Sequence, residues 1–280
     1  MKEVLISGRG RRWSAYLRDL YVFRGLFGFL AMREVQLQFV NMGLGFGWLL
    51  LRPLLQASVL AVIFGHVAKV NTGSTPYLLF VLSGFVAWSY FSGVTTRAGN
   101  SLLQYSGLIS KAYFPRLYLP LMPVLTGLLE LAVTLLTFIL IAGLGYGRWP
   151  GVSLLWLPVS IATLVVFTTA VGIWLSALTV DYRDVRLASG YVLQALMFLT
   201  PVIWPMSLLN ERLGERALAL GPWLACYPMY GVLEGMRYAL LGLGSPPLMY
   251  AAIGLLASLF LLLTGLRYFR NRDHMLADEI

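Results

Sequence analysis

The stretch RAGNSLLQYSGLISKAYFPRLYLP, Arg97 to Pro120, is a basic interruption between two long apolar runs. Asn100 can act as an N-cap and Gly107 as a left-handed C-terminal stop, which predicts a helix of about two turns over Ser101–Ser106. A helix this short is not stable alone in water, so it needs a surface to pack against. The pattern therefore predicts a docking point for another protein, and the alternative is an interfacial turn lying on the lipid headgroups.

The composition excludes an ordinary soluble domain. Of the 280 residues, 59% are hydrophobic and 12% are charged, and the mean hydropathy is +0.76. Crossing roughly 30 Å of hydrocarbon takes about 20 apolar residues in a helix, and runs of this length recur along the chain. The net charge of +9 flanks these runs, which favours a membrane protein beside anionic lipid and no nucleic-acid partner. The single cysteine, Cys226, excludes an internal disulfide and a cysteine-cluster metal site.

The apolar runs predict an all-α integral membrane protein with one domain. Residues 1–43 are expected to form a cytoplasmic and interfacial segment without a signal peptide, residues 44–268 a bundle, and residues 269–280 a cytoplasmic tail. An amphipathic helix from Trp13 to Phe27 is expected to lie in the interfacial plane. The six predicted spans are about Leu44–Val67, Tyr77–Val94, Tyr118–Leu144, Leu154–Leu178, Leu187–Ile203 and Leu248–Leu266.

Two segments between the later spans have their own patterns. VDYRDVR, Val180 to Arg186, predicts a tight charged loop. In TPVIWP, Pro201 and Pro205 are expected to break the helix of the fifth span. Met206 to Gly244 is too polar and too interrupted for one span, which predicts two half-helices dipping back into the outer leaflet.

The basic residues predict the orientation. Of the 21 Lys and Arg residues, fifteen fall on one side of the predicted membrane, five on the other side, and Arg52 within a span. Because cytoplasmic loops carry an excess of Lys and Arg, both termini are expected inside the cell.

Two charges are predicted within the spans, Arg52 and Glu130. An unpaired charge there costs several kcal/mol, so each needs a partner, a cavity or a ligand. Arg52 and the neighbouring Pro53 are expected to point inward. Glu130 is either paired within the bundle or takes part directly in transport.

Catalytic and metal-binding motifs are not found in the sequence. It contains no GxxxxGK[ST] phosphate loop and no HExxH, and His66 and His274 lie far apart. We therefore expect no enzyme activity, cofactor or metal site in this chain, and any uphill transport needs energy from elsewhere.

Five motifs in order resemble one family along nearly the whole chain. They are RE-(x)9-LG-(x)2-W-(x)4-P from Arg33 to Pro53, YFPRLYLP from Tyr113 to Pro120 with Glu130 after it, DYRDVR, TPVIWP, and YPMYGVLEGMRYALLG from Tyr227 to Gly242. Together they resemble the Wzm-like membrane subunits of type-2 ABC exporters that move polysaccharides.

The resemblance implies a homodimer in a bacterial inner membrane, paired with two copies of a separate ATPase subunit that binds ATP and Mg. The substrate would be a lipid-linked O-antigen, capsule or teichoic acid glycan. The implied ATPase contacts are Ser101, Leu102, Leu103, Gln104, Tyr105 and Ser106 of the short helix, with Asp181, Tyr182, Arg183, Asp184 and Arg186. Of the short helix, Leu102, Leu103 and Tyr105 are expected to face outward. The implied outer gate comprises Pro201, Pro205, Tyr227, Pro228, Glu234 and Arg237.

Aromatic side chains are expected along the path of a sugar polymer, because aromatic faces stack on sugar rings while the chain slides past. Membrane proteins also place Trp and Tyr at both interfaces, which explains the same residues without a substrate. Arg52 is expected to bind the phosphate of a lipid headgroup. The candidates for the path are Trp48, Trp88, Tyr90, Phe91, Trp174, Tyr191, Phe198 and Trp204.

Other functions remain open at this point. An exporter of drugs or small lipids with the same architecture would share the topology and the coupling loops. A secondary transporter fits poorly, because no internal repeat is evident and only one carboxylate lies mid-membrane. A membrane glycosyltransferase or acyltransferase would need an acidic or histidine cluster that the sequence does not show.

Overall fold

The computed structural model describes residues 13–39, 47–111, 113–214 and 221–272, and every regular element in them is helical. Five helical segments of this part of the chain are long and apolar enough to cross a membrane, which makes the chain a multi-pass membrane protein. They are Gly47–Val67 (α3 and η1), Tyr77–Gln104 (α4), Tyr118–Gly145 (α6 and η2), Val152–Asp181 (η3 and α7) and Leu248–Arg272 (α12).

The predicted fifth span is shorter than these five. It corresponds to α8, Arg183–Leu199, which has 17 residues and charged side chains in its first turn. The remaining helices are α1 (Trp13–Val22), α2 (Arg24–Phe39), α5 (Ser106–Ile109), α9 (Met206–Leu213) and α11 (Pro228–Leu241). The predicted N-terminal helix is thus divided into α1 and α2 at Phe23, and residues 1–12 and 273–280 lie outside the described residues.

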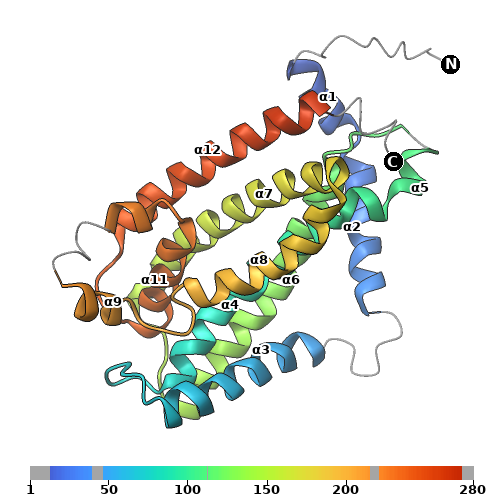
Figure 1. The fold of residues 1–280 in the computed structure, drawn as a ribbon. Helices are drawn as coiled ribbons and strands as arrows, with labels where there is room; N and C mark the ends of the chain where they lie inside the picture. Colours follow the sequence, from blue (N-terminus) through green and yellow to red (C-terminus); the bar gives the residue numbers. More distant parts are fainter. Residues whose placement is uncertain (1–12, 40–46, 112, 215–220, 273–280) are drawn as a thin grey trace.

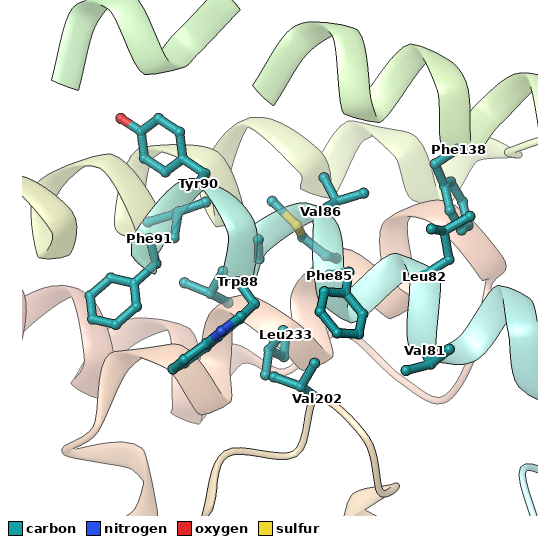
Figure 2. Close-up of a cluster of buried hydrophobic side chains, with 14 of the residues drawn as sticks. Val81, Leu82, Phe85, Val86, Trp88, Tyr90, Phe91, Phe138, Val202 and Leu233 are labelled. Carbon is teal, nitrogen blue, oxygen red and sulfur yellow. The ribbon is translucent and has the colours of Figure 1, made fainter. Parts of the chain in front are cut away.

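Helix α4 is the centre of the bundle, where it packs against both α6 and α7, while α12 packs along α7 (Figure 1). The side chains from Leu79 to Trp88 are all buried, so this helix carries the main apolar core. Figure 2 shows Phe85 and Trp88 of α4 near Leu233 of α11, with Val202 beside them. Because lipid tails are as apolar as these side chains, close van der Waals contact between them stabilises the packing of the helices.

The elements gather at two ends of the bundle (Figure 1). One end holds α1, α5, the connection between α7 and α8, and the last turn of α12. The other end holds α9, α11 and the connection that follows η2. This grouping is the one that the alternating predicted spans require.

The predicted separate helix over Ser101–Ser106 is wrong. Helix α4 continues to Gln104, and the short helix after it is α5, which begins at Ser106. Asn100 does not cap a new helix, because its Nδ2 donates to the carbonyl of Thr96 at 2.8 Å within α4. Leu102 is fully buried against Phe114 and neighbouring side chains, so tertiary packing keeps this turn attached to the span.

The predicted charged loop from Val180 to Arg186 is also wrong. Helix α7 extends to Asp181 and α8 begins at Arg183, so Tyr182 alone leaves the helical conformation, with φ −137° and ψ 108°. Asp184 stabilises the start of α8 because its negative charge lies near the positive end of the helix dipole.

The predicted break at TPVIWP is confirmed, since α8 ends at Leu199 and α9 begins at Met206. The segment from Met206 to Gly244 contains α9, a helical turn over 221–225, and α11. Short helices in place of one span are therefore confirmed there, but the described residues hold three helical segments where two were predicted. Their depth in the outer leaflet stays a prediction.

Candidate functional site

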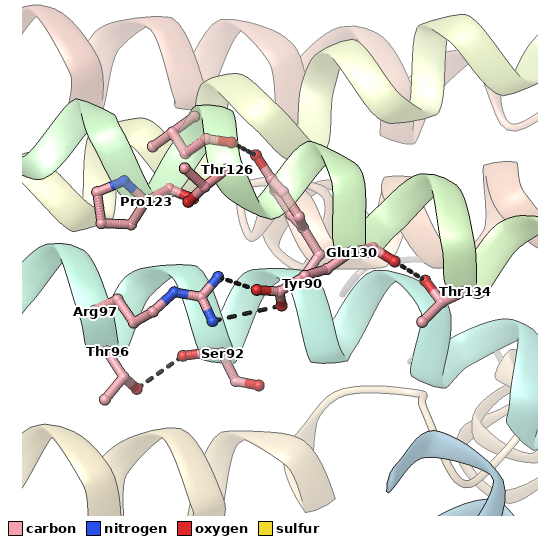
Figure 3. A network of polar contacts seen from close by, with 9 residues as sticks. Tyr90, Ser92, Thr96, Arg97, Pro123, Thr126, Glu130 and Thr134 are labelled. Carbon is pink, nitrogen blue, oxygen red and sulfur yellow. Dashed lines mark hydrogen bonds and ion pairs between the residues drawn. The ribbon is translucent and has the colours of Figure 1, made fainter. Parts of the chain in front are cut away.

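Arg97 and Glu130 form an ion pair between α4 and α6, as Figure 3 shows. The distance from Nη2 of Arg97 to Oε1 of Glu130 is 2.9 Å, and Nη1 donates to Oε2 at 3.4 Å. The side chains are 29% and 20% exposed. Glu130 is therefore paired within the bundle, and its partner is an arginine that the sequence pattern had assigned to a loop.

A second carboxylate, Glu34 of α2, interacts with the same pair. Burial raises the pKa of Glu34, the positive charge of Arg97 lowers it, and the negative charge of Glu130 raises it further. The Oε2 atom of Glu34 is buried and forms no hydrogen bond with the described residues. Sequence reasoning used Glu34 only as part of a motif; its approach to Arg97 depends on the docking of α2 against α6.

A groove of about 380 Å³ lies between α4 and α8, next to the ion pair. Arg97 is the charged member of its lining, and Gln194 of α8 contributes an amide. The remaining lining residues are small, polar or apolar: Trp88, Ser92, Gly93, Thr96, Gly190 and Leu193.

Several aromatic residues predicted to line a substrate path pack inside the chain. Phe91 is 1% exposed and stacks on Phe167 with ring centroids 5.0 Å apart. Tyr90 is 2% exposed and donates its hydroxyl hydrogen to the carbonyl of Val124 at 3.1 Å. Trp174 is half-buried and its Nε1 donates to a backbone carbonyl of α12. The path assignment is therefore corrected for Tyr90 and Phe91, and it stays a prediction for Trp174.

Other predicted path residues lie at the surface of the chain. Trp48 of α3 and both Tyr191 and Phe198 of α8 are exposed. Trp204 is half-buried and its Nε1 donates to the carbonyl of Phe198 at 3.0 Å. A substrate-path role for these four, as for the buried Trp88 at the groove, stays a prediction.

Arg52 differs from its expected position, because its side chain is exposed while the neighbouring Pro53 is buried. Successive positions on a helix point about 100° apart, so burial of Pro53 against α4 or α6 turns Arg52 away from the core. The expectation that both point inward is wrong for Arg52. Its contact with a headgroup phosphate stays a prediction.

Arg237 holds together the segment predicted to form the outer gate. This side chain is 2% exposed, lies over the ring of Phe80 with Cζ 3.8 Å from the centroid, and pairs with Glu234 at 2.9 Å. Its Nη2 donates to the carbonyls of Pro201 and Val202, the latter at 3.1 Å. A fully buried guanidinium is stable only with such partners.

Arg237, Glu234, Pro201 and Val202 form a bonded group that we call the outer cluster, and tyrosine hydroxyls add hydrogen bonds beside it. Thr200 Oγ1 and the hydroxyl of Tyr227 lie 3.3 Å apart, and Pro228 begins α11 directly after Tyr227. Tyr77 of α4 donates to the carbonyl of Ile203 at 2.7 Å, and Tyr230 donates to that of Leu199 at 3.1 Å. Sequence reasoning gave Tyr77 no role and included Tyr230 only within a motif, since the partners of both hydroxyls are backbone carbonyls that carry no residue-type signal.

Pro205 is buried at the end of the same segment. Of the six residues assigned to the outer gate, Arg237 bonds to Glu234 and Pro201, and Tyr227 contacts Thr200, the neighbour of Pro201. Pro205 and Pro228 are buried in the same two segments, and the gate role of all six stays a prediction.

The predicted ATPase contacts are divided between buried and accessible positions. Ser101 and Leu102 are buried, and Asp181 is 6% exposed because it accepts from the Tyr268 hydroxyl at 2.6 Å and pairs with Arg272 at 3.7 Å. Outward contact is corrected for these three. Leu103, Tyr105 and Ser106 are half-buried, Gln104, Tyr182, Asp184 and Arg186 are exposed, and the side chain of Arg183 lies outside the described residues.

Within the described residues, no three His, Cys, Asp or Glu side chains gather in a way that could hold a metal ion. The site instead comprises the ion pair of Arg97 and Glu130 inside the bundle, a groove with several polar groups beside it, and the hydrogen-bonded group around Arg237 at one end.

Comparison with known proteins identifies the family to which this chain belongs. Residues 25–241 match the family described as ABC-2 type transporter. The chain is 29% identical to the O-antigen export system permease protein RfbA of Myxococcus xanthus, over 94% of this chain and 98% of that protein. It is 24% identical to a protein of the same name from Klebsiella pneumoniae, over 94% and 95% of the two chains. The Polysialic acid transport protein KpsM of Escherichia coli is 22% identical, over 87% and 92%. This chain therefore belongs to the ABC-2 type transporter family.

Proposed function

We propose that the chain is the membrane subunit of an ABC exporter that carries a lipid-linked polysaccharide across the bacterial inner membrane. The observation that carries this proposal is the similarity, over 94% of the chain, to permeases named for O-antigen export. The five apolar segments and the paired intramembrane charge agree with a transport subunit. An exporter of drugs or small lipids would share the family but gains no support from these relatives.

Energy for export would come from a separate ATPase subunit that binds ATP and Mg. The accessible docking region is the end of the bundle with α5 and the start of α8, where Gln104, Asp184 and Arg186 are exposed. The excess of basic residues supports placing this end, and both termini, in the cytoplasm. Two permeases and two ATPase subunits would form the complete exporter.

Substrate contact would involve the exposed arginine of α3. Arg52 can make two hydrogen bonds to a phosphate through its planar guanidinium, which suits the headgroup of a lipid carrier.

Deletion of the gene in the source bacterium tests the proposal. The surface polysaccharide should disappear, its lipid-linked precursor should accumulate inside the cell, and the wild-type gene should restore export. Resistance to small toxic compounds should stay unchanged, which separates this function from a drug exporter. Surface polysaccharide at the wild-type level in the deletion strain would refute the proposal.

A further inference from the structure

The groove between α4 and α8 carries several polar groups on a mainly apolar lining. The hydroxyls of Ser92 and Thr96 donate to the backbone carbonyls of Trp88 and Ser92, each at 2.8 Å, which leaves their oxygen lone pairs able to accept. Gln194 is exposed on the opposite wall, and its amide offers both donors and an acceptor. A wall of this kind suits a ligand whose groups both donate and accept hydrogen bonds.

Two glycines keep the groove open. A Cβ atom at Gly190 of α8 would meet no other atom within 4 Å, and one at Gly93 of α4 would meet only Nη1 of Arg97, at 3.7 Å. Both positions therefore border empty space that a larger side chain would fill. Trp88 and Leu193, which are 4% and 8% exposed, add apolar surface to the lining.

The charge in the groove is already compensated. Arg97 is the charged side chain of the lining, and its guanidinium is held by Glu130 at 2.9 Å with Glu34 also interacting. An anionic ligand such as a phosphate or a sugar acid would have to compete with these carboxylates. A neutral sugar can use the remaining hydrogen-bonding groups and lay its C–H faces on the apolar surface.

We propose that this groove binds neutral sugar units of the polysaccharide during export. The inference rests on the proposed function and adds the ligand class of one site. Because the groove has no net positive charge, each sugar makes only ordinary hydrogen bonds there, and the polysaccharide can move on through the exporter.

Cysteine protection in cells tests the site. Cys226 is the single cysteine, so Cys226→Ser gives a cysteine-free background, to which Gln194→Cys or the control Ala195→Cys is added. Both positions are exposed on α8, but Ala195 is not part of the groove lining. A membrane-permeant maleimide should label the Gln194→Cys variant several-fold more slowly in cells that make the polysaccharide than in cells blocked in its synthesis. The Ala195→Cys variant should react equally in both.

The outcomes separate the site from the overall function. Equal labelling of the Gln194→Cys variant in both strains, with export intact, overturns the groove assignment but leaves the exporter function in place. Equal protection of the Ala195→Cys variant also overturns the groove assignment, because α8 is then shielded from the maleimide along its surface and not only at the groove. Loss of the exporter function itself is detected separately by the deletion experiment.

The ligand class is tested on the purified exporter. Maltoheptaose, a neutral oligosaccharide, should slow labelling of the Gln194→Cys variant several-fold, whereas inorganic phosphate at the same concentration should have no effect. Protection by phosphate and not by maltoheptaose would overturn the assignment to a neutral sugar.

Discussion

Nη2 of Arg97, near the C-terminal end of α4, lies 2.9 Å from Oε1 of Glu130, in the middle of α6. The pair joins two helices that also share a large apolar contact, so it fixes their register at one point along the bundle. Charges inside a membrane are costly unless paired. The pair thus explains how both residues can lie in apolar spans.

Glu130→Gln should destabilise the protein. Arg97 would keep its charge in a partly buried position without its carboxylate, which costs about 1–3 kcal/mol. The expected result is a lower midpoint of thermal unfolding in detergent. Glu211→Gln, at an exposed carboxylate of α9, should leave the midpoint unchanged.

A double variant checks the cause. Arg97→Gln combined with Glu130→Gln removes both charges, so it should be less destabilised than the sum of the two single variants. Strict additivity would show that the two side chains act independently.

Arg237→Lys should loosen the outer cluster although it keeps the charge. An ammonium cannot reproduce the planar contacts that the guanidinium makes with Glu234 and with the carbonyls of Pro201 and Val202. We expect a loss of about 1–3 kcal/mol, measured as thermal stability in detergent. Arg186→Lys is the control, because Arg186 is exposed at the start of α8, and its effect on thermal stability should stay within about 0.5 kcal/mol. Equal effects of the two changes would argue against a special role for Arg237.

Leu102→Asp and Arg186→Glu should fail in different ways. Leu102 is fully buried beside Phe114, so a carboxylate there should cost several kcal/mol and reduce the amount of folded protein in the membrane. Arg186 is exposed at the start of α8, so Arg186→Glu should leave that amount unchanged while lowering export and copurification with the ATPase. Immunoblots of membranes and surface-polysaccharide assays measure the two effects. Normal export by the Arg186→Glu variant would remove this residue from the ATPase contact.

Cys226 should react with a membrane-impermeant maleimide added to the outside of spheroplasts. The thiol is exposed, and its sulfur contacts the carbonyl of Pro222 at 3.5 Å. It precedes α11 at the end of the bundle opposite α5 (Figure 1). The Cys226→Ser variant gives the background signal. Labelling only after the cells are opened would reverse the proposed orientation.

The membrane-spanning helices and the breaks between helices could be predicted, because both have local causes in the sequence. Long apolar runs must form helices in lipid, since every backbone polar group there needs an internal partner. Pro201 and Pro205 disfavour continuation of α8, because proline lacks a backbone N–H donor and restricts the residue before it. The five long segments and the break before α9 agree with these rules.

The ends of α4 and α7 could not be predicted because two local structures compete there. Asn100 has the right side chain for an N-cap, yet it bonds to the carbonyl of Thr96 inside a continuing helix. What decides between them is the burial of Leu102 in a cluster formed with residues of another segment. Similarly, the charged sequence around Asp181 predicted a loop. In the structure Asp181 ends α7 and is buried, because Tyr268 and Arg272 of α12 bind its carboxylate.

The sequence by itself determined the membrane class, the family and most of the spans, since these depend on composition and on short motifs. Only the tertiary structure decided which residues meet: Arg97 with Glu130 across 33 positions, Arg237 with Pro201 across 36, and Ser92 with Gln194 across a groove. The physical reason is that such contacts depend on the packing and relative rotation of whole helices. Small differences in the packing of apolar side chains set that rotation, and no local pattern of residues records it.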